Sequence, residues 1–332
     1  MKERDAITAL IAGMRRSPQQ TNAPFASDAE IIDLDGARWA ITVDDYSAED
    51  RWDAGTASAD DAGTLGWNLV TATLSDLLAV GAVPRFMLNS FVSTPRMDAA
   101  WLRALSAGMD RALDACGAYM LGGDLGTGAE WRFTGVALGA LPAGRAALSR
   151  IARAPSGNVL VSGDFGDANL AAASDLGAPR LEIRLAESQW LAETNADAGG
   201  ACIDTSDGLV GALEALCLCD AGLRIELDCE AVPYAAGIDA AARALHLPRE
   251  IFLMGSAGEY ELVALAPEPA DHQRHGLRRI GRFAHDGDPG LHFHRGGRWI
   301  AHPGLPDPRE AASLEEYRGR LIALARKLFD TK

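Results

Sequence analysis

The stretch Asp204-Thr205-Ser206-Asp207-Gly208-Leu209 joins a short apolar run to a segment with helical periodicity. It predicts a strand over 201–203, then a turn, then a helix from Leu209 onward. One serine or aspartate is enough to cap the free N–H groups at the start of a helix. Because two aspartates flank a serine here, the turn indicates metal or phosphate binding in addition to capping.

Three other aspartates occupy comparable places in the chain. Asp44 ends a predicted strand, and Asp124 follows another strand at the pair Gly122-Gly123. Asp76 lies inside an apolar helix predicted over 62–82. Carboxylates that share one cleft repel each other unless a hard cation lies between them. If the fold gathers these side chains, the sequence predicts a Mg²⁺ site and phosphate chemistry, with ATP as the source of phosphate.

The composition is typical of a globular protein and argues against some classes of partner. The chain has 332 residues, 48% hydrophobic and 23% charged, and a formal net charge of −15. A globular protein of this length can bury a large core and divide into two domains. The negative charge argues against nucleic acid and against anionic membrane surfaces as partners. It also favours a metal ion over lysines as the cation that would hold a nucleotide.

The cysteines and the apolar runs indicate in which cellular compartment the protein is found. Five cysteines without disulfide-like spacing are typical of a reducing environment. The first residues do not resemble a signal peptide, and no apolar run reaches the roughly 18 residues of a membrane helix. We therefore expect a cytoplasmic protein that does not enter a membrane.

Strands and helices alternate along both halves of the chain, which predicts an α/β (α+β) protein. The segment 142–157 is rich in proline, glycine, alanine and arginine, as is typical of a crossover between domains. We predict an N-terminal domain over 1–145 and a C-terminal domain over 146–332, each with a sheet covered by helices on one face. The chain has no Walker lysine loop, so a nucleotide must bind by another arrangement.

In order, these motifs resemble the signatures of thiamine-monophosphate kinase, a member of the aminoimidazole ribonucleotide (AIR) synthetase superfamily, also called PurM-like. The helix 73–84 is similar to the family's Asn-Leu-Ser-Asp-Leu-Ala-Ala-Met-Gly-Ala-x-Pro, and 204–209 keeps Asp-x-Ser-Asp-Gly-Leu intact. Shorter matches occur at Ser27-Asp28-Ala29, Thr42-Val43-Asp44, Gly122-Gly123-Asp124-Leu125, 150–158 and Tyr260-Glu261-Leu262. The resemblance runs from about Asp28 to Phe293.

The resemblance implies a two-domain PurM-like fold in which the N-terminal, ATP- and Mg²⁺-binding domains of two chains pair into a dimeric barrel. It implies Mg²⁺ ligands at Asp28, Thr42, Asp44, Asp76, Asp124, Asp204 and Asp207. It implies nucleotide contacts at Gly123, Asp124, Arg150 and Ser206. From these sets we assign catalytic roles to Asp44, Asp124 and Asp207.

The departures from the family pattern fall mainly on the side of the second substrate. Arg51 replaces a histidine, and Gly258 stands where the family has a glutamate, unless Glu259 has taken over. An arginine suits a carboxylate or a phosphate, because its guanidinium binds such groups with two hydrogen bonds. We therefore assign Arg51 and Glu259 to a small-molecule acceptor that carries such a group.

The sequence thus predicts an ATP- and Mg²⁺-dependent phosphotransferase that resembles thiamine-monophosphate kinase, has an altered acceptor and acts as a homodimer. Two alternatives stay open. One is an AIR synthase-like ligase or dehydratase that activates an amide or carbamoyl oxygen by phosphorylation. The other is a non-catalytic nucleotide-binding partner protein, against which the intact aspartates count.

Overall fold

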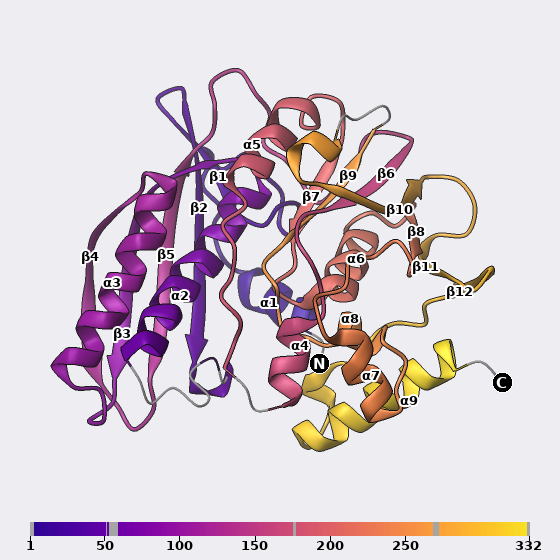
Figure 1. The fold of residues 1–332 in the computed structure, drawn as a ribbon. Helices are drawn as coiled ribbons and strands as arrows, with labels where there is room; N and C mark the ends of the chain where they lie inside the picture. The colour runs from indigo at the N-terminus through magenta and orange to yellow at the C-terminus, as the bar shows by residue number, and fades with distance from the viewer. Residues whose placement is uncertain (1–2, 51, 53–58, 175–176, 268–271, 331–332) are drawn as a thin grey trace.

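The computed structural model describes residues 3–50, 52, 59–174, 177–267 and 272–330. The described strands form two sheets, of order β1-β2-β5-β3-β4 and β12-β11-β8-β10-β6-β9-β7. In Figure 1 the five-stranded sheet lies to the left with α2 and α3 against it, and the seven-stranded sheet lies to the right. The chain passes from the first sheet to the second between Ala140 and Ser156.

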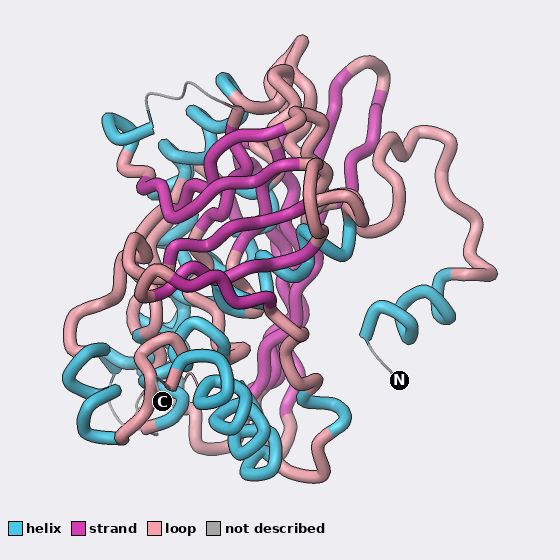
Figure 2. The backbone as a smooth tube through the Cα atoms, turned by 90° about the vertical axis from the view of Figure 1, so that its right-hand side faces the viewer, coloured by secondary structure: helices cyan, strands magenta, loops and turns pink. Residues whose placement is uncertain are grey.

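The first half of the chain builds the five-stranded sheet and its helices. Its elements are α1 (Glu3–Ile11), β1 (Glu30–Leu34), β2 (Ala37–Ser47), a 3-10 turn (Ala48–Asp50), α2 (Ala59–Ala79), β3 (Val83–Ser93), α3 (Ala99–Cys116), β4 (Tyr119–Thr127) and β5 (Arg132–Ala140). Figure 2 shows α1 at the end of a loop arm on the outside of the molecule. Arg4 on α1 donates a hydrogen bond to the Leu218 carbonyl, 2.9 Å away.

The second half builds the seven-stranded sheet. Its strands are β6 (Ser156–Val161), β7 (Ala201–Asp204), β8 (Arg224–Asp228), β9 (Leu262–Ala266), β10 (Arg278–Ala284), β11 (Gly290–Arg295) and β12 (Arg298–Ala301). Its helices are α4 (Asp167–Ala173), α5 (Leu185–Thr194), α6 (Gly208–Cys219), α7 (Ile238–Leu245), α8 (Ile251–Met254) and α9 (Leu314–Phe329), with 3-10 turns at His272–His275 and Pro308–Glu310. None of the described helices combines the length and the apolarity needed to span a membrane.

Glycines allow α2 to lie close to both of its neighbours. A Cβ at Gly66 would lie 2.0 Å from the Leu105 carbonyl oxygen of α3. A Cβ at Gly135 on β5 would lie 2.5 Å from Oγ1 of Thr73, so any other residue there would push α2 away from the sheet. This close approach brings the C-terminal end of α2, with Asp76, down onto β2.

Among the described residues, helices cover the five-stranded sheet on one face only. The covered face carries small and aromatic residues such as Ala40, Ala137 and Phe133, which are fully buried under α2. Paired residues on adjacent strands point to the same side of a sheet, so the strand registers define the other side as well. This second side, called the open face below, carries Trp39, Ile41, Val43, Val136, Leu138, Phe86, Leu88 and Tyr119.

The seven-stranded sheet has helices on both faces, so the prediction of one covered face is wrong for it. Val159 and Val161 on β6 belong to a core shared with α6. Leu160, which points the other way, packs in a second cluster with Leu191 of α5 and Leu78 of α2. That second cluster joins the two halves of the chain, because it contains residues from both.

Candidate metal and nucleotide site

Three aspartates from distant parts of the chain meet between the two sheets. Asp28 lies in the loop before β1, Asp76 lies on α2, and Asp204 ends β7. One carboxylate oxygen from each lies within 4.8 Å of the other two. Oxygen ligands at this spacing, from separate elements, suit a hard divalent cation such as Mg²⁺.

Asp28 supplies a carboxylate oxygen with no protein donor. Its side chain is fully buried, and Oδ1 accepts two hydrogen bonds from the Arg150 guanidinium, one of them at 2.9 Å from Nε. Oδ2 has no hydrogen-bond partner in the described part of the chain. Burial raises the pKa of Asp28 to about 7, Arg150 opposes this rise, and the charge of Asp204 adds to it. A buried oxygen without a donor is an atom that a cation would satisfy.

Asp76 is held by Thr42 on β2, whose hydroxyl donates to Oδ2 of the aspartate at 2.5 Å. Burial raises the pKa of Asp76 well above its usual range, and the charges of Asp44, Asp204 and Asp28 raise it further. Repulsion among neighbouring carboxylates of this kind disappears when a divalent cation binds between them. The electrostatics of the site therefore fit a metal.

Asp44 lies beside this cluster, on the same face of β2 as Thr42. Burial raises its pKa to about 7, and the neighbouring charge of Asp204 adds to the rise. A hydrogen bond from the Tyr46 side chain acts in the opposite direction. Asp44 is thus close enough for the charges of Asp204 and Asp28 to raise its pKa. It is not one of the three aspartates whose oxygens lie within 4.8 Å of one another.

Asp204 brings the second half of the chain into the site. It is 3% exposed, and its Oδ2 accepts a hydrogen bond from the Ser75 hydroxyl of α2. Its Oδ1 accepts from the Ser206 hydroxyl at 2.8 Å. The loop after β7 therefore fixes one side of this carboxylate and α2 fixes the other.

Gly123 and Asp124 lie away from the cluster within one chain. Asp44 pairs with Gly135, Gly135 with Asn89, and Asn89 with Gly123. Three strand spacings of about 4.8 Å therefore place Gly123 roughly 14 Å from Asp44 across the sheet. Asp124 points to the opposite side of the sheet from Asp44 and is exposed. The prediction that the strand ends at Gly122-Gly123, before Asp124, is wrong, because β4 is an edge strand, tolerates glycines and continues to Thr127.

Asp207 and Ser206 are exposed at the start of α6. Asp207 occupies the N-cap position without making a side-chain capping hydrogen bond. Burial raises the pKa of Tyr317 on α9, a hydrogen bond with Ser256 opposes the rise, and the charge of Asp207 adds to it. Asp207 therefore lies near α9, whereas Ser206 contacts the cluster through Asp204.

Of the two residues assigned to the acceptor, Arg51 and Glu259, the structure describes Glu259. Arg51 lies outside the described residues. Glu259 is 6% exposed, and its Oε1 accepts the Gly166 N–H at 2.9 Å. Burial raises the pKa of Glu259 to about 8, and the hydrogen bond from Gly166 opposes the rise. A Cβ at Gly258 would lie 2.4 Å from the Ser206 carbonyl oxygen, so this chain has no room for a glutamate there.

Sequence reasoning missed the aromatic side chains beside the carboxylates. Tyr46 stacks on Trp52, with ring centroids 4.9 Å apart, and Tyr260 meets Trp52 edge-on at 5.7 Å. Tyr260 lies in the Tyr-Glu-Leu match, but nothing in that motif indicates which way its ring points. The alternation of β2 was the available signal for Tyr46, because residues two apart on a strand share a face.

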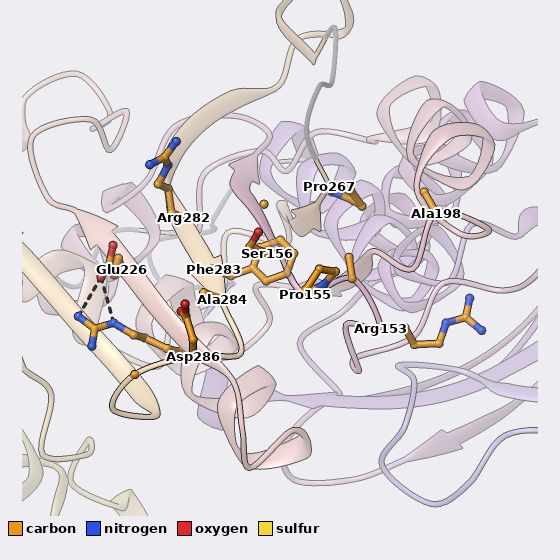
Figure 3. A pocket seen from close by; sticks show the side chains of 14 residues that line it. Arg153, Pro155, Ser156, Ala198, Glu226, Pro267, Arg282, Phe283, Ala284 and Asp286 are labelled. Carbon is orange, nitrogen blue, oxygen red and sulfur yellow. Dashed lines mark hydrogen bonds and ion pairs between the residues drawn. The ribbon is translucent and has the colours of Figure 1, made fainter.

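A large cavity is separate from the cluster. Its volume is about 920 Å³, and none of the predicted site residues lines it. Figure 3 shows Phe283 and Ser156 near its centre, with Arg282 and Arg153 on opposite sides. Arg224 in its wall pairs with Glu226 at 2.8 Å. This cavity is therefore distinct from the carboxylate site, which lies where the two sheets meet.

The chain is similar in sequence to known proteins. Residues 26–141 match the family model of the AIR synthase related protein, N-terminal domain. The chain belongs to the AIR synthase-related superfamily. It is 29% identical over 228 residues to a thiamine-monophosphate kinase of Methanopyrus kandleri, covering 66% of this chain and 71% of that one. It is 30% identical over 230 residues to the Salmonella typhimurium thiamine-monophosphate kinase, covering 63% and 66%.

A solved structure has the same overall fold as this chain. AaThiL, complexed with AMPPCP and TMP, aligns over 89% of this chain and 92% of its own, with a TM-score of 0.72 and 17% identity. The match covers both sheets, so the PurM-like two-sheet fold expected from the sequence is confirmed. At this identity the likeness speaks for the fold alone.

Proposed function

We propose that this protein is an ATP- and Mg²⁺-dependent phosphotransferase of the thiamine-monophosphate kinase type. The observation that carries the proposal is the meeting of Asp28, Asp76 and Asp204, with a buried Asp28 oxygen that lacks a protein donor. The curated relatives that the chain resembles are thiamine-monophosphate kinases. Phosphoryl transfer depends chiefly on positioning and on neutralising charge, which such a cluster can provide.

Each side chain has a proposed part. Asp28, Asp76 and Asp204 would hold Mg²⁺, with Thr42 and Asp44 at the edge of the site. When bound, Mg²⁺ would neutralise phosphate charge. Arg150 fixes Asp28 through two hydrogen bonds, and its remaining donors are available to a phosphate oxygen. Ser206 is exposed beside Asp204, where its backbone and hydroxyl could contact the nucleotide.

We further propose that two copies pair through the open face. Val43 is 61% exposed, Leu88 39% and Tyr119 68%, on a face with no described element packed over it. An apolar patch of this kind on a sheet typically marks a protein–protein interface. A second copy of the chain fits it, because two such sheets can close into a barrel that removes their open edges.

Pairing of the sheets would bring Asp124 into the site. β1 covers β2 only from Ala37 to Ile41, so in the described part of the chain the edge of β2 over 42–47 has no strand beside it. β4 is the other free edge of the same sheet. If β4 of one copy lies along this part of β2, the Gly123-Asp124 segment of the partner subunit comes within about one strand spacing, roughly 5 Å, of the β2 backbone at Asp44. Asp124 would then act across the interface.

The acceptor is proposed to be a small molecule with a phosphate or carboxylate group. The absence of space at Gly258 supports an acceptor side that differs from the family pattern. We propose that Arg51 and Glu259 bind the acceptor. We also propose that Asp207, which lies near α9, is a ligand of Mg²⁺. We propose a cytoplasmic location, where ATP and Mg²⁺ are both available.

The direct test incubates pure protein with ATP, Mg²⁺ and thiamine monophosphate and follows thiamine diphosphate by chromatography. Slow or absent conversion together with tight Mg·ATP binding supports an altered acceptor. Efficient turnover would restore the plain thiamine-monophosphate kinase assignment. No binding of ATP with or without Mg²⁺ would refute the phosphotransferase itself. Release of ADP only with an amide- or carbamoyl-bearing substrate would favour the ligase or dehydratase class.

A further inference from the structure

Tyr260 crosses from one half of the protein into the core of the other. It directly precedes Glu261 and β9 of the seven-stranded sheet, yet its side chain belongs to the buried cluster of the five-stranded sheet. Its ring lies 6.5 Å from that of Tyr46 and 5.7 Å from that of Trp52, both edge-on. Tyr260 is 9% exposed. The ring therefore docks one half of the chain onto the other.

The backbone of Tyr260 is held in an unfavourable conformation. Its φ is 55°, in the left-handed region that bulky side chains seldom adopt. Such a conformation persists only where the surroundings impose it, and it is frequent at functional sites. The strain points to a requirement for the direction of this ring.

Both chain neighbours of Tyr260 are tied down inside the second half. The Glu261 carboxylate accepts two hydrogen bonds from Arg184, at 2.5 and 2.6 Å. The Glu261 N–H donates to Oγ1 of Thr205 at 2.9 Å. On the other side, Glu259 accepts the Gly166 N–H. These contacts fix the segment that carries Tyr260.

The same segment touches the carboxylate site at two points. Thr205, which accepts the Glu261 N–H, directly follows Asp204 in the chain. Tyr46, which the Tyr260 ring contacts, lies two residues after Asp44 on the same face of β2. One segment therefore reaches Asp204 through Thr205 and Asp44 through Tyr46.

The electrostatics agree with this placement. Burial raises the pKa of Tyr260, and the charges of Asp204 and Asp44 raise it further. Burial likewise raises the pKa of Tyr46, with Tyr260 and Asp44 adding to the rise. The Tyr260 side chain makes a hydrogen bond with the side chain of Tyr46, and Tyr46 makes one with Asp44.

We propose that Tyr260 is a positioning residue, which sets Asp44 of the first half at a fixed place relative to Asp204 of the second. The proposal rests on the phosphotransferase function above, since it assigns a role in the same site. A metal cluster that spans two halves of a chain works only if their separation is fixed, because displacements of about 1 Å can cost a hundredfold in rate. Tyr260 provides this fixed separation through its ring and its hydroxyl.

The test compares Tyr260→Phe and Tyr260→Leu with the wild type. Calorimetry measures the affinity for Mg²⁺ in the presence of a non-hydrolysable ATP analogue, and thermal melting in EDTA measures stability. Tyr260→Phe keeps the ring but loses the side-chain hydrogen bond with Tyr46. It should therefore melt like the wild type and bind Mg²⁺ about tenfold more weakly. Tyr260→Leu should bind more weakly still.

Tyr234→Phe is the matched control, because Tyr234 packs against the core of the second half and has no described contact with the carboxylates. It should bind Mg²⁺ like the wild type. If Tyr260→Phe and Tyr260→Leu bind Mg²⁺ as tightly as the wild type, Tyr260 only stabilises the fold and the inference is refuted. If the wild type itself binds neither Mg²⁺ nor the analogue, the proposed function is refuted.

Discussion

Ser75 on α2 donates a hydrogen bond from its hydroxyl to Oδ2 of Asp204 at the end of β7. The two residues are 129 positions apart, one on the helix that packs on the five-stranded sheet and the other on a strand of the seven-stranded sheet. Both side chains are buried. The carboxylate site is therefore assembled when the two halves of the chain dock, and its geometry depends on that docking.

Removing this contact should destabilise the protein. Ser75→Ala leaves the buried Asp204 carboxylate without a donor from α2, which should cost about 1–3 kcal/mol of unfolding free energy. Urea titration measures the loss. Ser206→Ala is the matched control, because it removes the other hydroxyl that contacts Asp204 from an exposed residue. Equal losses for the two variants would contradict a special role for the buried contact.

Neutralising a cluster aspartate should not destabilise the metal-free protein. Asp76→Asn removes one of several buried carboxylates that repel each other. In EDTA we expect the variant to melt no lower than the wild type, while Mg²⁺ raises the melting temperature of the wild type alone. Asp98→Ala supplies the contrast, since Asp98 caps α3 and its loss should cost about 1 kcal/mol with or without Mg²⁺. A large drop for Asp76→Asn in EDTA would indicate a structural role.

Metal-free stability should fall as the pH rises toward neutrality. The pKa values of Asp28 and Asp44 rise on folding from 3.8 to about 7, mainly through burial. Between these values the folded chain holds more protons than the unfolded chain. The stability from these groups is thus complete below the unfolded pKa and is lost as the pH rises through about 7.

Melting curves in EDTA from about pH 5.5 to about pH 8 measure this loss, and the same scan in saturating Mg²⁺ is the control. Because Mg²⁺ favours the ionised carboxylates, the decline should shrink or disappear in its presence. A metal-free protein that becomes more stable over this range would contradict the buried cluster.

The sequence predicts the ligands better than it predicts their partners. Asp76 and Asp204 stand at recognisable local positions, namely an apolar helix and a strand–helix turn, so their motifs could be found one by one. Their meeting with Asp28 follows from tertiary packing, in which Gly135 lets α2 approach β2. No local pattern indicates that Ser75 would contact Asp204, since the two lie far apart in sequence.

The aromatic contacts of Tyr260 and the end of β4 were harder to predict, because both depend on residues that are distant in sequence. The direction of the Tyr260 ring depends on a left-handed backbone that its buried neighbours impose. The two glycines before Asp124 favour a turn locally, but β4 pairs along its whole length with β3 and stays extended. In both cases long-range contacts override the local preference.

Pairing of two copies should be needed for activity. Val43→Glu places a charge on the open face, 61% exposed and without contact to the cluster. Light scattering after gel filtration should show a dimer for the wild type and a monomer for the variant, with loss of Mg·ATP turnover. Leu245→Glu, the same kind of change at a 51% exposed apolar residue of α7 in the other half of the chain, is the control and should stay dimeric. A monomeric wild type that turns over ATP would contradict the pairing.

Mixing two inactive variants should show whether Asp124 acts across the interface. Asp44→Asn and Asp124→Asn should each weaken Mg·ATP binding strongly, because each removes a ligand charge from the site. If Asp124 of the partner subunit completes the site around Asp44, a mixed dimer contains one site with both losses and one intact site. Random mixing makes about half of the dimers mixed, so co-refolded protein should recover roughly a quarter of wild-type turnover by this subunit arithmetic. If Asp44 and Asp124 serve the same subunit's site, every site carries a loss and the mixture stays inactive.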